Sequence, residues 1–314
     1  LYLVGCGDSY FISLYGQYLF GIFNNIFTAA ENSYEALVYR KLIPKCTLIA
    51  ISASGRTART VDCARMANER GLRVIALTNF PDSPLTKYAN FSLITQVPEP
   101  FGPPSSTSTT ALLALAYTSI NLALSKKGTN DQLHKFAEIL MKMPVKAEEI
   151  INATNKEFRD IAKLISMNDR VYLVGAGPGY ITCLFGAAKF REATWMHSYA
   201  FEAEEFHHYG MMSLDSNDIV ILTARTGSSF NKMMKIYDAL NRIGAKCIVI
   251  TDRREKFEHA HSIISLPEVP ESLSTILDII PLQILAVLTA MEKNLNVVGF
   301  RYGKILSKLI GYYE

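Results

Sequence analysis

One stretch of this sequence occurs twice, and the repeat restricts the possible folds more than any other feature. Residues 1–20 read LYLVGCGDSYFISLYGQYLF and residues 171–190 read VYLVGAGPGYITCLFGAAKF, with identical residues at a constant offset of 170. Two more matches follow in the same order: IAISASGRT at 49–57 with ILTARTGSS at 221–229, and GLRVIALT at 71–78 with GAKCIVIT at 244–251. Three matches in one order indicate one fold used twice. The length of 314 residues fits two domains of about 150 residues each.

Each half alternates short apolar runs with longer amphipathic stretches. The apolar runs have the length of β-strands and lie at Leu1–Val4, Thr47–Ile51, Val74–Thr78, Phe91–Ile94, Val171–Val174, Ile219–Thr223, Lys246–Thr251 and Ile263–Leu266. The stretches between them, such as Thr60–Arg70 and Ser229–Ile243, have helical periodicity and end at a glycine. Apolar strands that alternate with helices predict parallel sheets covered on both faces. We therefore predict an α/β fold of two tandem, doubly wound parallel-sheet modules of the flavodoxin-like kind.

The expected domain boundaries follow from the repeat. The first module covers residues 1–127 and the second covers residues 169–292. Residues 128–168 have the periodicity of helices and form a helical connection, and a further apolar helix is expected at Ile276–Met291. Residues 293–314 remain as a C-terminal tail.

Charge and cysteine content exclude several classes of function. The net charge of +3, from scattered basic residues, argues against binding to nucleic acid or to an anionic membrane surface. No run of about 18 consecutive apolar residues is present, so we expect no membrane-spanning helix. The five cysteines lack Cys-x-x-Cys spacing, which argues against a zinc knuckle or a disulfide framework and favours a reducing cytoplasm. The first residues already have the pattern of a buried strand, so we expect no charged leader or signal peptide from this sequence.

The loops that follow the strands are the candidate sites, because ligands of open parallel sheets bind beyond the carboxyl ends of the strands. In the loop after the first strand, Gly7 lets the backbone approach an anion and Ser9 offers a hydroxyl group. The loop at 52–57, SASGRT, follows the second strand and leads into a helix, whose free N–H groups attract an anion. A tight turn or an elaborate helix cap is the alternative for these loops. Thr226–Ser229 has the matching position in the second half, and its ability to bind an anion stays open.

A third loop and a group of acid–base residues complete the candidates. The hydroxyl-rich run at 105–110 precedes the apolar helix Ala111–Leu124 and is either the rim of a ligand site or a flexible loop. Glu192 lies on the expected helix Ile181–Ala193, and a Glu/His cluster follows at 202–208. Isomerisation of a sugar needs a carboxylate to move a proton between carbons and an acid–base group to open the ring. No third glycine of a dinucleotide site, no Walker lysine and no zinc spacing is present, so we expect no cofactor and no metal.

These motifs resemble the SIS (sugar isomerase) family over nearly the whole chain, in particular its branches that contain the isomerase half of glucosamine-6-phosphate synthase and the sugar-phosphate deaminases. The family's phosphate loop, Ser-x-Ser-Gly-x-Thr, is similar to residues 52–57, and its Cys-Gly-x-Ser turn is similar to residues 6–9. The resemblance implies five-stranded sheets and a sugar phosphate as substrate. The binding residues that it implies are Gly7, Ser9, Ser52, Ser54, Gly55, Thr57, Ser106 and Thr107.

The resemblance also implies catalytic residues. The family segment Gly-Ala-x-Lys-x-Lys-Glu is similar to residues 186–192 and implies that Glu192 moves the proton between C1 and C2. The pattern Glu-x-x-His-Gly is similar to residues 205–210 and implies that His208 opens the ring, in a homodimer with shared active sites. A functional lysine of the family's tail corresponds to Lys304 or to its competitor Lys308, so that the tail would close the active site.

Three departures from the family pattern bear on the reaction. Asp8 stands where threonine is usual, Arg56 where the synthase has glutamate, and Ser108 where a lysine is typical. The arginine is similar to that of deaminase-type branches, and this sequence does not include the synthase's glutaminase domain. We therefore expect an amino-sugar phosphate isomerase/deaminase that converts glucosamine 6-phosphate, or a close analogue, to fructose 6-phosphate and ammonia. The alternatives are a plain aldose–ketose phosphosugar isomerase, a fructosamine-phosphate deglycase and a regulatory sensor of sugar phosphates.

Overall fold

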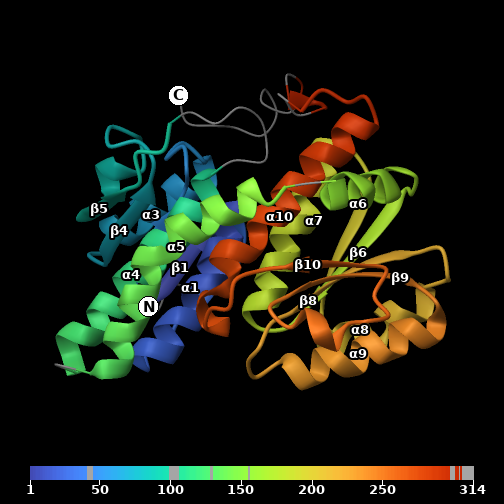
Figure 1. The fold of residues 1–314 in the computed structure, drawn as a ribbon. Helices are drawn as coiled ribbons and strands as arrows, with labels where there is room; N and C mark the ends of the chain where they lie inside the picture. The colour runs from blue at the N-terminus through green and yellow to red at the C-terminus, as the bar shows by residue number, and fades with distance from the viewer. Residues whose placement is uncertain are drawn as a thin grey trace. The chain divides into compact units, whose positions relative to one another are not determined.

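The computed structural model describes residues 1–40, 45–98, 106–127, 130–154, 156–297, 301–303 and 305. The chain divides into two compact units (Figure 1). Unit 1 comprises Leu1–Pro100, Ser105–Leu140 and Tyr302–Glu314, and unit 2 comprises Phe101–Pro104 and Met141–Arg301. Helix α5 (Asp131–Asn152) runs from one unit into the other and contains Pro144, and α6 (Lys156–Ser166) belongs to unit 2.

Unit 1 contains a fully parallel sheet with the strand order β2-β1-β3-β4-β5. Its strands are β1 (Tyr2–Gly5), β2 (Ala29–Asn32), β3 (Thr47–Ile51), β4 (Arg73–Thr78) and β5 (Phe91–Ile94). Four of these agree with the strands predicted for the first half to within one residue at each end. The prediction missed β2, a half-buried edge strand of sequence AAEN without a large apolar side chain.

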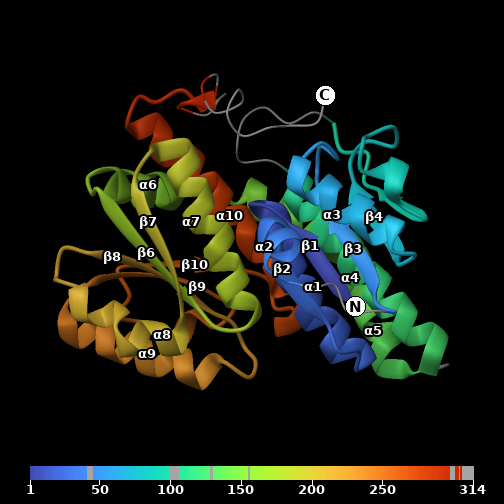
Figure 2. The ribbon, with the colours of Figure 1, turned by 180° about the vertical axis from the view of Figure 1, so that it is seen from behind.

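Helices cover both faces of this sheet. On one face lie α2 (Ser33–Val38) and α3 (Ala58–Glu69) (Figure 2). Tyr2 and Val4 of β1 share a core with these helices. The opposite face carries α1 (Asp8–Asn24) and α4 (Ser106–Lys127). Gly16 of α1 allows close packing there, because a Cβ atom would lie 2.4 Å from Leu3 and 2.7 Å from Leu115 of α4. Burial on both faces explains why the central strands are apolar throughout.

Unit 2 repeats this arrangement, with the strand order β10-β9-β8-β6-β7 in a second parallel sheet. Its strands are β6 (Arg170–Gly175), β7 (His197–Glu202), β8 (Ile219–Ala224), β9 (Lys246–Thr251) and β10 (Ser262–Ser265). On one face lie α7 (Pro178–Thr194) and α10 (Glu271–Glu292), and on the other lie α8 (Ala203–His208) and α9 (Phe230–Ile243) (Figure 1). Short 3-10 helices lie at Thr86–Tyr88, Gly210–Ser213 and Arg254–Lys256. The predicted fold of two doubly wound modules is confirmed, and β7 is the second strand that the prediction missed.

The internal register of the two units is the same. Leu3 of β1 pairs with Ile49 of β3, and at the repeat offsets Leu173 of β6 pairs with Ile221 of β8. A Cβ atom on Gly186 would meet Leu173 and Leu282, as one on Gly16 would meet Leu3 and Leu115. These matches align α1 with α7 at an offset of 170, and α4 with α10 at an offset of 167. Residues of the two units therefore correspond position by position at these offsets.

Two core features bear on the sequence-based expectations. Helix α10 is long and apolar enough to cross a membrane, but 78% of its apolar window is buried against the rest of the protein, as in the core helix of a globular domain. Within unit 2 it packs mainly against α6 and α7. All five cysteines are free thiols, and burial raises the pKa of Cys63, Cys183 and Cys247 to about 12. Buried thiols of this kind are core residues rather than nucleophiles.

Candidate functional site

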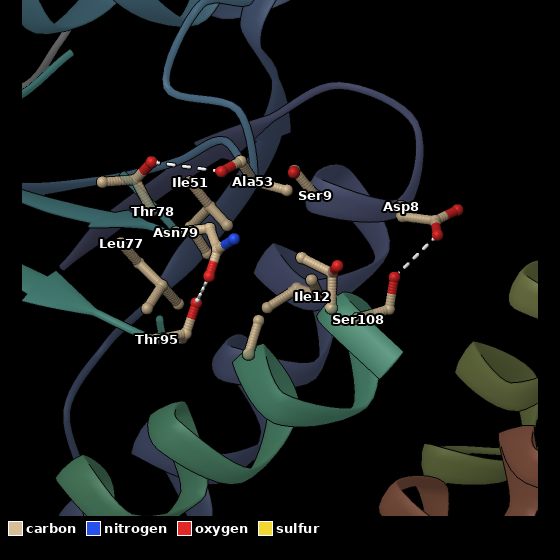
Figure 3. Close-up of a pocket in the computed structure, with 12 residues that line it drawn as sticks. Asp8, Ser9, Ile12, Ile51, Ala53, Leu77, Thr78, Asn79, Thr95 and Ser108 are labelled. Atoms are coloured by element: carbon tan, nitrogen blue, oxygen red, sulfur yellow. Dashed lines mark hydrogen bonds between the residues drawn. The ribbon is translucent and has the colours of Figure 1, made fainter. Parts of the chain in front are cut away.

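The strand order of unit 1 places a crevice at the carboxyl ends of its strands, between β1 and β3. Strand β1 has β2 on one side and β3 on the other, so the connections leave β1 and β3 in opposite directions. Ligands of open α/β sheets bind at such a switch point, beyond the carboxyl ends of the strands. A cavity of about 160 Å³ lies at this edge (Figure 3). It is lined by Asp8, Ser9, Ile12, Ile51, Ala53, Leu77, Thr78, Asn79, Thr95, Thr107, Ser108 and Ala111.

Two of the predicted binding residues line this cavity. Ser9 lies in the first turn of α1 and is buried. Thr107 lies in the first turn of α4, and its buried hydroxyl group has no hydrogen-bond partner among the described residues. An unpaired buried hydroxyl costs about 1–3 kcal/mol, which a polar ligand would recover. The helix starts therefore present two hydroxyl groups to a ligand.

The prediction overlooked three polar residues that line the same cavity. Thr78 is the last residue of β4, Asn79 follows it, and Thr95 follows β5. The Thr78 hydroxyl donates to the Ala53 carbonyl oxygen at 3.2 Å, and Thr95 Oγ1 bonds Asn79 Oδ1 at 3.1 Å (Figure 3). Asn79 Nδ2 also donates to the Val97 carbonyl oxygen at 2.7 Å. Their position at the carboxyl ends of predicted strands was the signal that could have identified them.

The two departures from the family pattern near this cavity contact each other. The Ser108 hydroxyl donates to the Asp8 carboxylate at 2.7 Å, between the first turns of α4 and α1 (Figure 3). Both side chains line the cavity. Asp8 thus brings a carboxylate to the cavity wall, and Ser108 holds that carboxylate in place.

The predicted phosphate loop leads from β3 into α3. Thr57 is the N-cap residue of α3, and its hydroxyl bonds that of Ser52 at 3.0 Å. The Arg56 N–H donates to Ser54 Oγ at 3.2 Å, and Ser54 and Arg56 line a separate hollow with residues 80–83. Gly55 has φ +63°, and a Cβ atom there would lie 2.1 Å from Ser83 Oγ. Only glycine fits this tight approach without strain.

The structure places the predicted binding residues at different positions in unit 1. Ser9 and Thr107 line the cavity, whereas the phosphate loop with Ser52, Gly55 and Thr57 borders it through Ala53. Gly7 has φ +57° at the start of α1 and allows the tight turn there. The third candidate loop was predicted wrongly for its described part, because residues 106–110 are not a loop but the first turns of α4. Their hydroxyls are compatible with a helix since they can bond backwards, as Thr110 Oγ1 does to the Ser106 carbonyl oxygen at 3.0 Å. Ser106 itself is exposed.

The predicted catalytic residues that the structure describes lie in unit 2. Glu192 lies near the end of α7, where Lys189 Nζ contacts its carboxylate at 2.6 Å. The Lys189 side chain is 5% exposed and the Glu192 side chain 28% exposed, so the ion pair lies at the edge of the core. His208 ends α8, is exposed, and has its ring 5.6 Å from that of His207. Lys304 and Lys308 lie outside the described residues.

Among the described residues, no three His, Cys, Asp or Glu side chains lie close enough together to hold a metal ion. A hydrogen-bonding cavity and a phosphate-type loop are thus the main chemical features of unit 1. The cavity volume lies below the about 300–1,000 Å³ of sites that enclose larger molecules.

Comparison with known proteins agrees with this geometry. The profile of the SIS domain family matches residues 1–122 and 163–293. Glutamine--fructose-6-phosphate aminotransferase [isomerizing] of Clostridium acetobutylicum is 29% identical over 302 residues, which are 95% of this chain and 50% of that protein. The chain therefore spans about half the length of this relative.

Solved structures show the same fold. The C-terminal domain of glucosamine-fructose-6-phosphate aminotransferase from Francisella tularensis has a TM-score of 0.87 at 22% identity. The alignment covers 95% of this chain and 85% of the chain of that domain. A glucosamine-6-phosphate deaminase from Thermotoga maritima has a TM-score of 0.74 at 20% identity and covers 96% of this chain and 88% of its own.

Proposed function

Because this chain belongs to the SIS domain family, we propose that it binds a sugar phosphate through unit 1 and converts it between aldose and ketose forms. The observation that carries the proposal is the hydroxyl-lined cavity at the switch point, directly beside the loop 52–57. The phosphate group would bind at the N-terminus of α3, where backbone N–H groups and the helix dipole attract an anion. Ser9 and Thr107 would then donate to sugar hydroxyl groups.

Glu192 is the proposed base of the isomerisation. In the open-chain aldose it removes the proton from C2, which produces an enediol, and it returns the proton to C1, which produces the ketose. The Lys189 ammonium stabilises the ionised carboxylate, the form that accepts a proton. His208 would open the ring by protonating the ring oxygen. These two roles rest on the resemblance of residues 186–192 and 205–210 to the family pattern.

The finer proposal is that the substrate carries an amino group at C2. Proton transfer would then pass through an enolamine to a C2 imine, and water would hydrolyse this imine to the ketose phosphate and ammonia. Arg56 at the phosphate loop, in place of the synthase's glutamate, supports this reading. So does the likeness in fold to a deaminase. Plain aldose–ketose isomerisation and cleavage of a fructosamine phosphate use the same cavity and remain the alternatives.

The decisive experiment incubates the protein with glucosamine 6-phosphate and measures ammonia and fructose 6-phosphate together. Equal amounts of both products would support the deaminase, and conversion of glucose 6-phosphate without ammonia would support the plain isomerase. Glu192→Gln should abolish turnover and spare binding of the sugar phosphate, whereas Glu258→Gln, at an exposed site in unit 2, serves as the control of equal charge. Binding without turnover of any sugar phosphate in the wild type would contradict the enzyme and favour the sensor.

We also propose that the protein acts in the cytoplasm as a homodimer with shared active sites. If His208 serves the site of the partner subunit, a mixture of Glu192→Gln and His208→Ala subunits should regain part of the activity that each variant lacks alone. Mixed dimers would then contain one site with both residues intact. Absence of regained activity in mixed dimers, verified by tagged subunits, would contradict a shared site.

A further inference from the structure

The loop of unit 2 that matches the phosphate loop already contains an anion, which the chain itself supplies. The Ser228 N–H donates to the Glu271 carboxylate at 2.6 Å, and the Ser229 N–H donates to it at 3.2 Å. The Ser229 hydroxyl donates to the same carboxylate. Three donors at the start of α9 thus converge on one carboxylate, as such a loop would bind an external oxyanion.

The glycine of this loop makes the contact possible. Gly227 matches Gly55 of unit 1, since both follow the second central strand at the repeat offset of 172. A Cβ atom on Gly227 would lie 2.2 Å from Glu271 Oε2, so the carboxylate lies directly against the loop backbone. Glu271 is the first residue of α10, and the offset of 167 between α4 and α10 matches it with Pro104 in the sequence. The first half of the sequence therefore has proline in place of a carboxylate at the matching position.

The space behind the loop is also filled in unit 2. Ala53 and Ala111 line the cavity of unit 1, and their counterparts at the repeat offsets are Arg225 and Asp278. Arg225 is 2% exposed and Asp278 is fully buried, with 3.6 Å between Arg225 Nε and Asp278 Oδ1. Arg225 Nη2 also donates to the carbonyl oxygen of Pro267 at 2.6 Å. Two small side chains in one unit are thus replaced by a large charged pair in the other.

We infer that Ser228 and Ser229 at the start of α9 form an oxyanion site occupied by the chain's own Glu271 carboxylate, so that unit 2 accepts a free phosphate only when this carboxylate is removed. Thr226 of the same loop is not part of this site, because its N–H and its hydroxyl donate to Asp252. The inference goes beyond the proposed function, because it concerns the other unit and needs no turnover. Its ligand class is the tetrahedral oxyanion, with inorganic phosphate as the simplest example.

The test counts bound phosphate in Glu271→Ala and in the wild type by equilibrium dialysis with labelled inorganic phosphate. Glu271→Ala should bind one phosphate per chain more than the wild type, with millimolar affinity. Phosphate should also raise the unfolding temperature of Glu271→Ala more than that of the wild type, because a ligand of the folded state stabilises it. Phosphate at unit 1 contributes equally to both proteins and cancels in the comparison.

Two further variants make the outcome specific. Glu258→Ala removes one exposed carboxylate from unit 2 and should leave the count unchanged. Adding Ser229→Ala to Glu271→Ala should remove the additional phosphate. The inference is overturned if folded Glu271→Ala binds no additional phosphate, if Glu258→Ala binds it as well, or if the Ser229 change leaves it in place. Should Glu271→Ala not fold, Glu271→Ser, whose short side chain also vacates the loop, decides by the same count.

Discussion

Units 1 and 2 share a sheet order and a register but differ at the carboxyl edges of their sheets. Unit 1 has a cavity lined by Ala53 and Ala111, and unit 2 has a buried arginine and aspartate at the same positions. The first half has Pro104 at the sequence position that matches Glu271, and in unit 2 the Glu271 carboxylate accepts hydrogen bonds from the loop. The comparison teaches that a few side chains decide which copy of a duplicated fold keeps an open cavity, while the strand order and register stay the same.

The largest predicted effect comes from the buried pair of unit 2. Asp278→Ala leaves the Arg225 guanidinium buried without its counter-charge, and we expect a loss of about 3–5 kcal/mol in the free energy of unfolding. Urea unfolding of both proteins measures the change. The paired replacement Arg225→Met with Asp278→Leu should recover most of the loss, since apolar residues of similar volume replace buried ion pairs at little cost. If the double variant were as unstable as Asp278→Ala, the pair would not be the cause.

A second, smaller loss of stability is expected from a change in the phosphate-type loop of unit 1. Gly55→Ala places a Cβ atom 2.1 Å from Ser83 Oγ at a residue with φ +63°, so clash and backbone strain add up. We expect a loss of about 2–3 kcal/mol and weaker binding of sugar phosphates. Gly71→Ala is the matched control, because Gly71 has φ +72° and open space around it, and should cost only about 1 kcal/mol. Urea unfolding and calorimetric titration test both variants, and equal losses would contradict a specific role of the contact with Ser83.

Sequence patterns predicted the central strands well and the edges of the sheets poorly. β3 and β9 are apolar runs buried on both faces, which periodicity detects. β2 is a half-buried strand of small and polar residues, and only its pairing with β1 identifies it. For the site, the loop motif 52–57 and the cavity of unit 1 lie at the same carboxyl end of the sheet, because Ala53 lines that cavity. The contacts of Glu271 with Ser228 and of Asp8 with Ser108 join residues far apart in the chain, and no local pattern predicts them.

A third prediction concerns the pH dependence of unit 2. Burial raises the pKa of Asp278 from its usual 3.8 to about 6, although the Arg225 charge acts in the opposite direction. A pKa that is higher in the folded state means that the folded protein binds the proton more tightly, so this group contributes stability at low pH and loses it as pH rises through 6. From pH 7 to pH 5, the wild type should therefore gain about 1 kcal/mol in free energy of unfolding relative to Asp278→Asn. Urea unfolding at the two pH values measures the difference, and a constant difference would contradict the raised pKa.

The smallest predicted effect concerns the carboxylate at the wall of the unit 1 cavity. Asp8→Asn removes a negative charge from the site but keeps an oxygen that can accept from Ser108. We expect binding of sugar phosphates to strengthen by about 1 kcal/mol, or roughly fivefold in Kd, because the repulsion of the phosphate is lost. Calorimetric titration at low and high salt measures the gain, which should shrink as salt screens the charge.

Ser108→Ala is the matched control for this change, since it removes the hydrogen bond and keeps the charge, and it should not strengthen binding. One outcome of the same titrations would contradict repulsion between the Asp8 carboxylate and the phosphate group of the ligand. If Asp8→Asn weakened binding of glucosamine 6-phosphate but not of glucose 6-phosphate, Asp8 would contact the amino group of the ligand. The departure from threonine would then select amino sugars in unit 1, at a position where unit 2 has Pro178 and no side chain of either kind.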